Sequence, residues 1–547
     1  MSQTTAGREH WSSSFGFIMA AAGSAIGLGN IWKFPYITGE NGGGAFVLVY
    51  LLCIAVIGVP VMICEITLGR HTQLSPVGAF RVLNPPISRL AHFIGLCMVL
   101  LGIFLAAFKE WGWSAMTLGL GVVIFRYGWK VVGGMGVVAG FCILSFYSVV
   151  AGWTIGYMIK AVTGKLAFTD VPVAAAAFGS FIDNPLWAVG CHAVFMLLCV
   201  LIVYKGIRSG IERWSKILMP VLFLILIVLI VRGITLPGAM AGVQFYLSPD
   251  FSKISTNSIL IALGHAFFSL SLGMGAIITY GSYVEKEQNI FMATLWIVCL
   301  DTAVALLAGL AIFPSVFATG LAPDAGPGLV FQVLPVVFNH IPFGPFWAAM
   351  FFFLLLIAAL TSGISLLEVV TAYFVDERKW SRKSATVVFG LVIFLLGSLS
   401  AISITGWQNL PWLHDALVVA FGKTKASFFD VMDNLASNWM LPLGGLFISL
   451  FVGWVWGTKK AIDEIRHGSH NFADVHLVAL LAGLKDDPSH NDPRHVVTLA
   501  SVWGIFIRFI SPVAVTIAFL NTIGWLNLTP KKPAAPEPAP MEQPAKP

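Results

Sequence analysis

A single carboxylate interrupts one of the most apolar stretches of this chain. Asp301 lies in "LWIVCLDTAVALLAG", where every other side chain is uncharged. A charged side chain at the centre of a bilayer costs about 2.5–3.5 kcal/mol on insertion scales, so such residues commonly mark ion or proton sites. We therefore interpret Asp301 as a functional residue.

Two other apolar stretches contain residues that disfavour a continuous membrane helix. Residues 13–38 contain "GSAIGLGN", and residues 256–283 contain "SLSLGMG". Irregular backbone in hydrocarbon persists only where an ion, a ligand or a side chain satisfies its polar groups. Small residues four apart, such as Gly23 and Gly27, are also typical of close helix packing. Two breaks at matching positions favour a binding site at the membrane midplane.

The elements that carry these residues are predicted to cross a membrane. The 547 residues are 57% hydrophobic and only 11% charged, whereas soluble domains average about 25% charged residues. Apolar runs of about 20 residues match the thickness of a bilayer. We expect an all-α polytopic membrane protein with apolar segments at 13–38, 41–69, 132–161, 186–205, 214–236, 256–283, 290–317, 344–375, 384–402, 433–457 and 497–525.

The topology depends on a further apolar stretch, residues 90–127, which "FKEWGW" interrupts. This stretch could form a hairpin of two short spans, a re-entrant loop or an interfacial segment. Lys and Arg are about twice as frequent on the predicted cytoplasmic side, which places the N-terminus inside. A hairpin keeps that orientation. We expect a cytoplasmic tail at 1–12, no cleavable signal peptide and a Pro-rich disordered tail at 530–547.

Other chemistries lack a supporting pattern. The net charge of +6 fits cytoplasmic loops rather than nucleic-acid binding. The seven Cys lie in apolar segments without metal-ligand spacing, so we expect core residues and no disulfide or bound metal there. No HExxH, nucleophile elbow or paired-carboxylate pattern is present. We expect neither an enzyme nor a cofactor, and the oligomeric state stays open.

In its apolar segments the sequence resembles the neurotransmitter:sodium symporter family, in its bacterial amino-acid-transporting branch. The similar stretches follow the family order along nearly the whole chain, at 8–46, 58–70, 144–157, 262–284, 358–370 and 428–445. Two departures are the insertion at 90–127 and the absence of a twelfth family helix. The resemblance implies a transporter domain (13–529) with an inverted repeat of five plus five helices (13–236 and 256–457), broken first and sixth core helices and an eleventh helix (497–525).

The resemblance implies two sodium sites. Thr361 and Ser362 would share one helix face with Ala358, as their spacing allows, although such hydroxyls also bond back to the preceding turn. The implied site-two ligands are Gly23, Ile26, Ala358, Thr361 and Ser362. The implied site-one ligands are Ala25, Asn30, Ser269 and Asp301, together with the carboxylate of the substrate.

The resemblance also implies a substrate site with mostly apolar walls, in which the Met274 side chain can adapt its shape. The free amides of the opened helix would favour the carboxylate of the substrate. Monoamine-transporting relatives carry Asp where this chain has Gly27, so we expect an amino acid rather than an amine. A neutral hydrophobic or aromatic L-amino acid fits best. The implied lining residues are Ser24, Ala25, Leu28, Gly29, Ile143, Tyr147, Phe268, Ser269, Ser271, Met274, Ser362 and Leu366.

Gates are implied on both sides of this site. Tyr147 and Phe268 would cover the substrate, and Lys33 would pair with Asp433 outside them. Many relatives carry Arg in place of Lys33, so this pair is expected to be looser. Each pair could also be an ordinary interfacial charge. The implied inner gate consists of Arg8, Trp11, Tyr283 and Asp376.

Two further carboxylates lie within the apolar segments. We expect Glu65 to accept hydrogen bonds from the free amides of an unwound helix. Glu368 has no partner that the sequence identifies, and a proton site and a residue of the inner path both stay open.

Ion coupling is predicted from the residues around Asp301. Chloride-dependent relatives carry Asn at this position and Ser at the position of Ala305, so we expect chloride-independent transport. His265 could lie near Asp301 and support proton countertransport, or could simply pack in the core. We expect a sodium-coupled amino-acid symporter that works by alternating access in a bacterial inner membrane. A receptor and an ion channel are the alternatives.

Overall fold

The computed structural model describes residues 9–83, 94–100, 128–321, 328–406, 427–469 and 497–526, with single residues at 119, 122 and 472, and most of these residues are helical. In these ranges the β pairing is one isolated antiparallel bridge, between Gly43 and Pro249. Nine helices there are long and apolar enough to cross a membrane, and a bent pair makes a tenth candidate. The predicted all-α polytopic architecture is therefore confirmed.

The spans overlap the predicted apolar segments. Nine segments form helices that continue across the predicted membrane, some with π-helical turns inside them. These are α3–α4 (Gly44–Thr72), α8 (Lys130–Val162), α10 (Pro185–Tyr204), η3–α11 (Ile207–Ile234), α15 (Ile290–Ala318), α17 (Gly344–Arg378), α18 (Arg382–Gly406), α20–α22 (Phe428–Arg466) and α25–α26 (Leu499–Thr522). Shorter helices connect them, namely α5 (Pro76–Leu83), α9 (Val171–Ile182), α12 (Ala239–Leu247) and η5–α16 (Leu329–Asn339).

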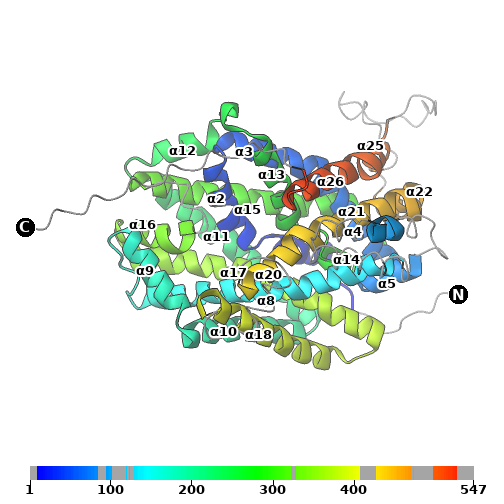
Figure 1. The fold of residues 1–547 in the computed structure, drawn as a ribbon, viewed down its shortest axis with the longest axis horizontal. Coiled ribbons are helices and arrows are strands. Elements are labelled where there is room, and N and C mark those ends of the chain that lie inside the picture. Colours follow the sequence, from blue (N-terminus) through cyan, green and yellow to red (C-terminus); the bar gives the residue numbers. More distant parts are fainter. Residues whose placement is uncertain are drawn as a thin grey trace, which may run out of the picture.

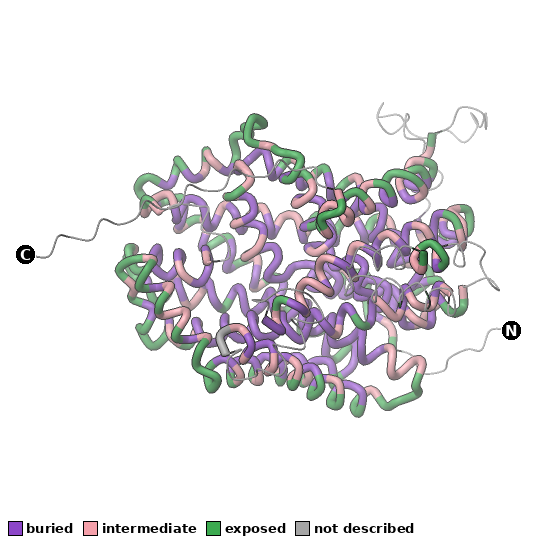
Figure 2. The backbone as a smooth tube through the Cα atoms, in the orientation of Figure 1, coloured by how far each residue is buried: buried purple, intermediate pink, exposed green. Residues whose placement is uncertain are grey.

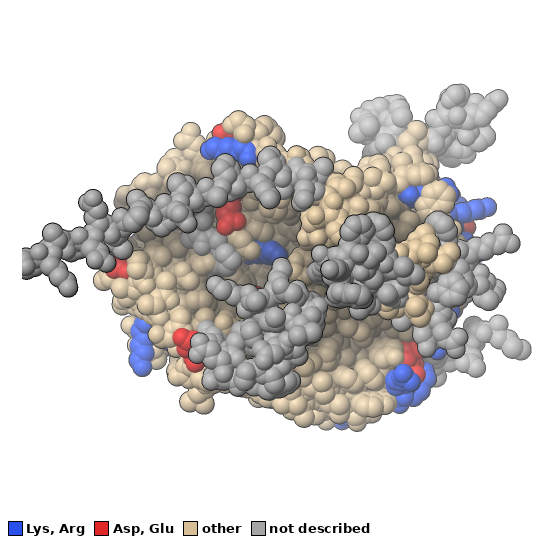
Figure 3. All heavy atoms as spheres, viewed as in Figure 1, with Lys and Arg blue, Asp and Glu red and all other residues tan. Residues whose placement is uncertain are grey.

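The spans differ in how far they are enclosed by others. In α17, 89% of the most apolar window is buried, against 33% in α18, so α17 is central and α18 is peripheral. α17 packs along α8, and α10 lies against both α8 and α18 (Figure 1). Buried backbone fills the middle of the bundle and exposed backbone lies at its rim (Figure 2). Most visible charged side chains lie toward the two ends of the long axis (Figure 3).

The first span is broken, as the sequence predicts. Ser13 caps the N-terminus of α1 (Ser14–Ala25), because its hydroxyl accepts a hydrogen bond from the Gly16 amide. The helix ends at Ile26, which has an extended backbone. η1 and α2 then continue the span over Gly29–Glu40, bent by 50° from α1.

The sixth segment is broken as well. α13 (Thr256–Ser269) and α14 (Ala276–Gly281) are separated by non-helical residues 270–275. Positive φ angles at Ser271, Gly273 and Gly275 make this turn. A Cβ at Gly273 would lie 2.4 Å from the Leu441 carbonyl oxygen, so both the space and the backbone angle require glycine there.

A buried carboxylate satisfies part of this second break. Oε1 of Glu65, on α4, accepts a hydrogen bond of 2.7 Å from the Gly273 amide. α14 packs closely on α4, since a Cβ at Gly69 would lie 2.2 Å from the Ile278 carbonyl oxygen. The predicted role of Glu65 is therefore confirmed.

Some predictions fall outside the described residues. In 90–127, residues 94–100 are helical, and most of the remainder, including the proposed hairpin, lies outside. The tails at 1–8 and 530–547 lie outside as well. The inverted repeat, its boundaries and the remaining domain limits stay predictions.

Substituting Glu65 tests how strongly this bond stabilises the break. Glu65→Ala leaves a buried amide without its acceptor, which costs about 1–3 kcal/mol. We expect a lower thermal unfolding temperature of the detergent-purified protein. Glu65→Gln keeps an acceptor oxygen and should restore most of the loss, and equal losses in the two variants would contradict this role.

Candidate ion and substrate site

Asp301 sits in a compact polar cluster formed by both broken helices. Its Oδ1 accepts a bond of 2.8 Å from the Asn30 side-chain amide, and its Oδ2 accepts one of 2.8 Å from the Ser269 hydroxyl. Asn30 Oδ1 in turn accepts from the Gly27 amide at 3.0 Å. The cluster therefore joins α15 to the first break and to the end of α13. It contains three of the four residues predicted for sodium site one, and the fourth, Ala25, is buried in the first break.

Tyr50 completes this cluster, and sequence analysis missed it. Its hydroxyl donates to the Ser269 hydroxyl at 3.0 Å. His265 does not bond to Asp301. Its ring lies 5.3 Å from the Tyr50 ring, and neither ring nitrogen has a hydrogen-bond partner among the described residues. The only sequence signal for Tyr50 was a lone hydroxyl in the apolar stretch "FVLVYLLC".

A second oxygen cluster lies where α17 passes the first break. The Ser362 hydroxyl contacts the carbonyl oxygens of Ser24 and Ile26 at 3.1 and 3.2 Å. The Thr361 hydroxyl lies 3.4 Å from the Ile26 oxygen and 3.0 Å from the Ala358 oxygen. The remaining predicted ligand of this site is adjacent, because a Cβ on Gly23 would lie 3.2 Å from Thr361 Cβ. Neutral oxygens of this kind suit a hard cation such as Na⁺.

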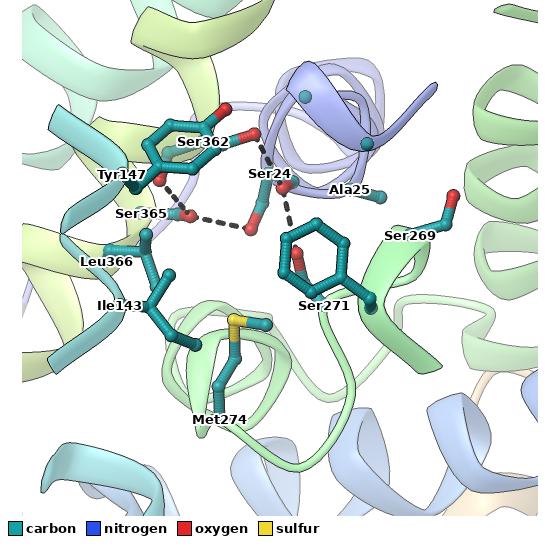
Figure 4. Close-up of a pocket in the computed structure, with 13 residues that line it drawn as sticks. Ser24, Ala25, Ile143, Tyr147, Ser269, Ser271, Met274, Ser362, Ser365 and Leu366 are labelled. Carbon is teal, nitrogen blue, oxygen red and sulfur yellow. Dashed lines mark hydrogen bonds between the residues drawn. The ribbon is translucent and has the colours of Figure 1, made fainter. Parts of the chain in front are cut away.

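A cavity lies between these clusters (Figure 4). It contains eleven of the twelve predicted lining residues. The exception is Leu28, whose amide donates to the Tyr147 hydroxyl at 3.1 Å. Gly27 and Ser365 line the cavity as well, although the sequence did not identify them as lining residues. The lining is Ser24, Ala25, Gly27, Gly29, Ile143, Tyr147, Phe268, Ser269, Ser271, Met274, Ser362, Ser365 and Leu366.

A larger cavity lies beyond Tyr147 and Phe268, which line both spaces. Lys33 and Asp433 both line this outer cavity, but no ion pair within 4.0 Å joins these two described residues. The Lys33 ammonium lies 4.8 Å from the Phe268 ring centre, and Asp433 accepts from the Ser437 hydroxyl at 2.7 Å. In this conformation each of the two charges has another contact, and the predicted outer ion pair is not formed.

On the opposite side, Trp11 packs against Tyr283. Their ring centres are 6.0 Å apart, and the Trp11 indole donates to the Tyr280 carbonyl at 3.0 Å. Asp376 accepts from the Ser75 amide at 2.6 Å. Arg8, its predicted partner, lies outside the described residues.

Glu368 has partners that the sequence did not indicate. The Tyr283 hydroxyl donates to its Oε1 at 2.6 Å, and Arg382 forms an ion pair with its Oε2 at 2.5 Å. Arg382 is the first residue of α18 and lies two residues before the apolar segment predicted at 384–402.

Comparison with known proteins identifies the family. A profile described as "Sodium:neurotransmitter symporter family" matches residues 8–122 and 184–478. The chain belongs to this family. It is therefore a sodium-dependent membrane transporter and not an enzyme.

Individual members of the sodium:neurotransmitter symporter family extend the similarity along the chain. The "Uncharacterized sodium-dependent transporter YhdH" of Bacillus subtilis is 39% identical over 94% of this chain and 98% of its own. The human "Sodium- and chloride-dependent GABA transporter 2" is 27% identical over 84% of this chain and 75% of its own. The crystal structure of MhsT in complex with L-phenylalanine matches with a TM-score of 0.73 at 41% identity, over 94% of this chain and 100% of that one.

The buried pair of Glu368 and Arg382 gives a testable prediction. Arg382→Met leaves a buried carboxylate without its cation, and breaking such a pair costs about 3–5 kcal/mol. We expect a marked drop in unfolding temperature for this variant. The double variant Glu368→Gln/Arg382→Met removes the unpaired charge and should recover much of the loss. Equal instability of the single and double variants would show that the pair is not coupled.

Proposed function

We propose that this protein couples the entry of Na⁺ to the uptake of a neutral hydrophobic or aromatic L-amino acid by alternating access. The observation that carries the proposal is an apolar-walled cavity placed between two clusters of neutral and anionic oxygens. Ile143, Met274 and Leu366 form apolar wall on one side. The MhsT structure, which has a similar fold, holds L-phenylalanine.

The polar end of the cavity supports a zwitterion. Near the first break a backbone amide and the Tyr147 hydroxyl lie together, and amides at a helix start favour a carboxylate. A Cβ on Gly27 would lie 2.7 Å from Ser362 Oγ and 2.9 Å from the Tyr147 hydroxyl oxygen. A side-chain carboxylate at position 27 would therefore require the Ser362 and Tyr147 side chains to move. The carboxylate that completes the first sodium shell would then come from the substrate.

Na⁺ and substrate binding would be coupled because the first break contributes to both sites. Ser24 and Ile26 present carbonyl oxygens at the break, while the same break forms one wall of the substrate cavity. Ion binding would fix the broken backbone in the shape that the substrate requires. Substrate affinity is thereby raised by Na⁺, and by linkage Na⁺ affinity is raised equally by the substrate.

Uptake into proteoliposomes tests the proposal. With an inward Na⁺ gradient we expect accumulation of labelled L-phenylalanine, and no accumulation when K⁺ replaces Na⁺. Thr361→Val removes one oxygen of the second cluster, and a hydrogen bond or contact to a charged group is worth about 1.5–3 kcal/mol, so the Na⁺ concentration for half-maximal uptake should rise roughly tenfold or more.

The matched control is Thr294→Val on α15, whose buried hydroxyl bonds back to the Ile290 carbonyl. This variant should transport with unchanged Na⁺ dependence. Accumulation that ignores the Na⁺ gradient would contradict the proposal, and so would bound phenylalanine that never exchanges across the membrane.

Two finer parts of the proposal, chloride independence and proton countertransport, depend on Asp301. Among the described residues its carboxylate bonds only to neutral groups, so Na⁺ would be the cation that balances it. A fixed negative charge there makes a bound chloride unnecessary. After Na⁺ leaves, a proton could neutralise the carboxylate, which gives proton countertransport.

Uptake by wild type and Asp301→Asn tests both parts. We expect wild-type uptake to be equal in chloride and gluconate, and to respond to a pH gradient. The Asn side chain cannot exchange a proton, so its uptake should lose that pH response and need more Na⁺. A wild type that requires chloride would refute the first part. An equal pH response in both proteins would refute the second.

A further inference from the structure

Two serine hydroxyls face each other in the wall of the substrate cavity. Ser24 of α1 and Ser365 of α17 are 341 residues apart, and their Oγ atoms are 2.7 Å apart. Both side chains are buried and both line the cavity. The pair lies beside the aliphatic side chains of Leu366 and Ile143 (Figure 4).

The protons of this pair can be assigned from chemistry alone. The Ser365 hydroxyl lies 2.8 Å from the Ser362 carbonyl oxygen, which can only accept, so Ser365 donates its single proton there. The contact with Ser24 then requires Ser24 to donate to Ser365. Each hydroxyl has used its proton and keeps at least one lone pair.

The neighbouring serines follow the same pattern. The hydroxyl of Ser271 donates to the Ser24 carbonyl at 2.9 Å, and that of Ser362 points to carbonyls of the first break. The serine part of the lining therefore offers hydrogen-bond acceptors and no spare donors. The Tyr147 hydroxyl also lines the cavity and is the group proposed above for the substrate carboxylate, while Ile143 and Leu366 beside the pair are apolar.

We propose that the Ser24–Ser365 pair makes the cavity select substrates whose side chain carries a hydrogen-bond donor. This inference rests on the proposed function and specifies its substrate class. A donor such as an indole N–H can bond to the free lone pairs. A side chain that carries only a hydrogen-bond acceptor finds no donor on these serines. It therefore loses its hydrogen bond to water without replacing it. A net bond of about 0.5–1.5 kcal/mol corresponds to roughly threefold to tenfold in affinity.

Competition against labelled L-phenylalanine in Na⁺ measures this preference on the full-length purified protein. Two pairs of amino acids match in shape and differ in one polar atom. Tryptophan should bind at least threefold more tightly than 3-(3-benzothienyl)alanine, which replaces the N–H by sulfur. 3-(4-Pyridyl)alanine, which carries only an acceptor, should bind more weakly than phenylalanine.

Serine variants test whether the Ser24–Ser365 pair, rather than the shape of the cavity, causes the preference. Ser365→Ala frees the Ser24 proton for a ligand, so pyridylalanine should gain affinity relative to phenylalanine. Ser24→Ala/Ser365→Ala removes the acceptors, so tryptophan should lose its advantage over the benzothienyl analogue. The control is Ser449→Ala, because this buried hydroxyl also bonds back to a carbonyl, that of Gly445, but does not line the cavity.

The results distinguish this inference from the proposed function. If phenylalanine binds with Na⁺ but wild type shows neither preference, the inference is overturned and the proposed function stands. Preferences that persist unchanged in the double variant overturn it as well. Failure of wild type to bind any of these amino acids in Na⁺ would refute the proposed substrate class, and the inference with it.

Discussion

The structure depends on satisfying the backbone groups that two broken helices release inside the membrane. Water is absent from the hydrocarbon region, so each freed amide or carbonyl needs a protein partner, an ion or a ligand. Glu65 accepts from the amide of Gly273, and the Tyr147 hydroxyl accepts from that of Leu28. The hydroxyl of Ser362 contacts two carbonyls of the first break. Tyr147 and Ser362 therefore both satisfy the first break and line the substrate cavity.

This arrangement ties the site to helices from two groups. α1 packs on α15, and α14 packs on α4, whereas α17 packs along α8 and α10 lies beside them. The substrate cavity takes residues from both groups, since Ser24 and Met274 face Ile143 and Leu366 across it. A movement of one group against the other would change the shape of the cavity and the spacing of both oxygen clusters together. The geometry is thus suited to alternating access.

The sequence predicted the features whose residue types are unfavourable in a membrane-spanning helix. Glycines and lone polar residues located both breaks, and an isolated charge located Asp301. Other features require knowledge of which helices are neighbours. The hydroxyl of Tyr50 and that of Ser365 look ordinary in their own segments, and each acquires a role only from a residue more than 200 positions away. The separation of Lys33 and Asp433 depends on how distant helices pack, which no local pattern encodes.

Asp301 and Glu368 illustrate how the surroundings decide the role of a buried carboxylate. Both are fully buried in apolar helices. Glu368 forms an ion pair with Arg382, so its negative charge is balanced within the protein. Asp301 bonds to the neutral Asn30 and Ser269 within the described chain. An anion without a fixed counter-charge in hydrocarbon is stable only while a mobile cation accompanies it. In the proposed function Na⁺ is that cation, and a proton replaces it after Na⁺ leaves.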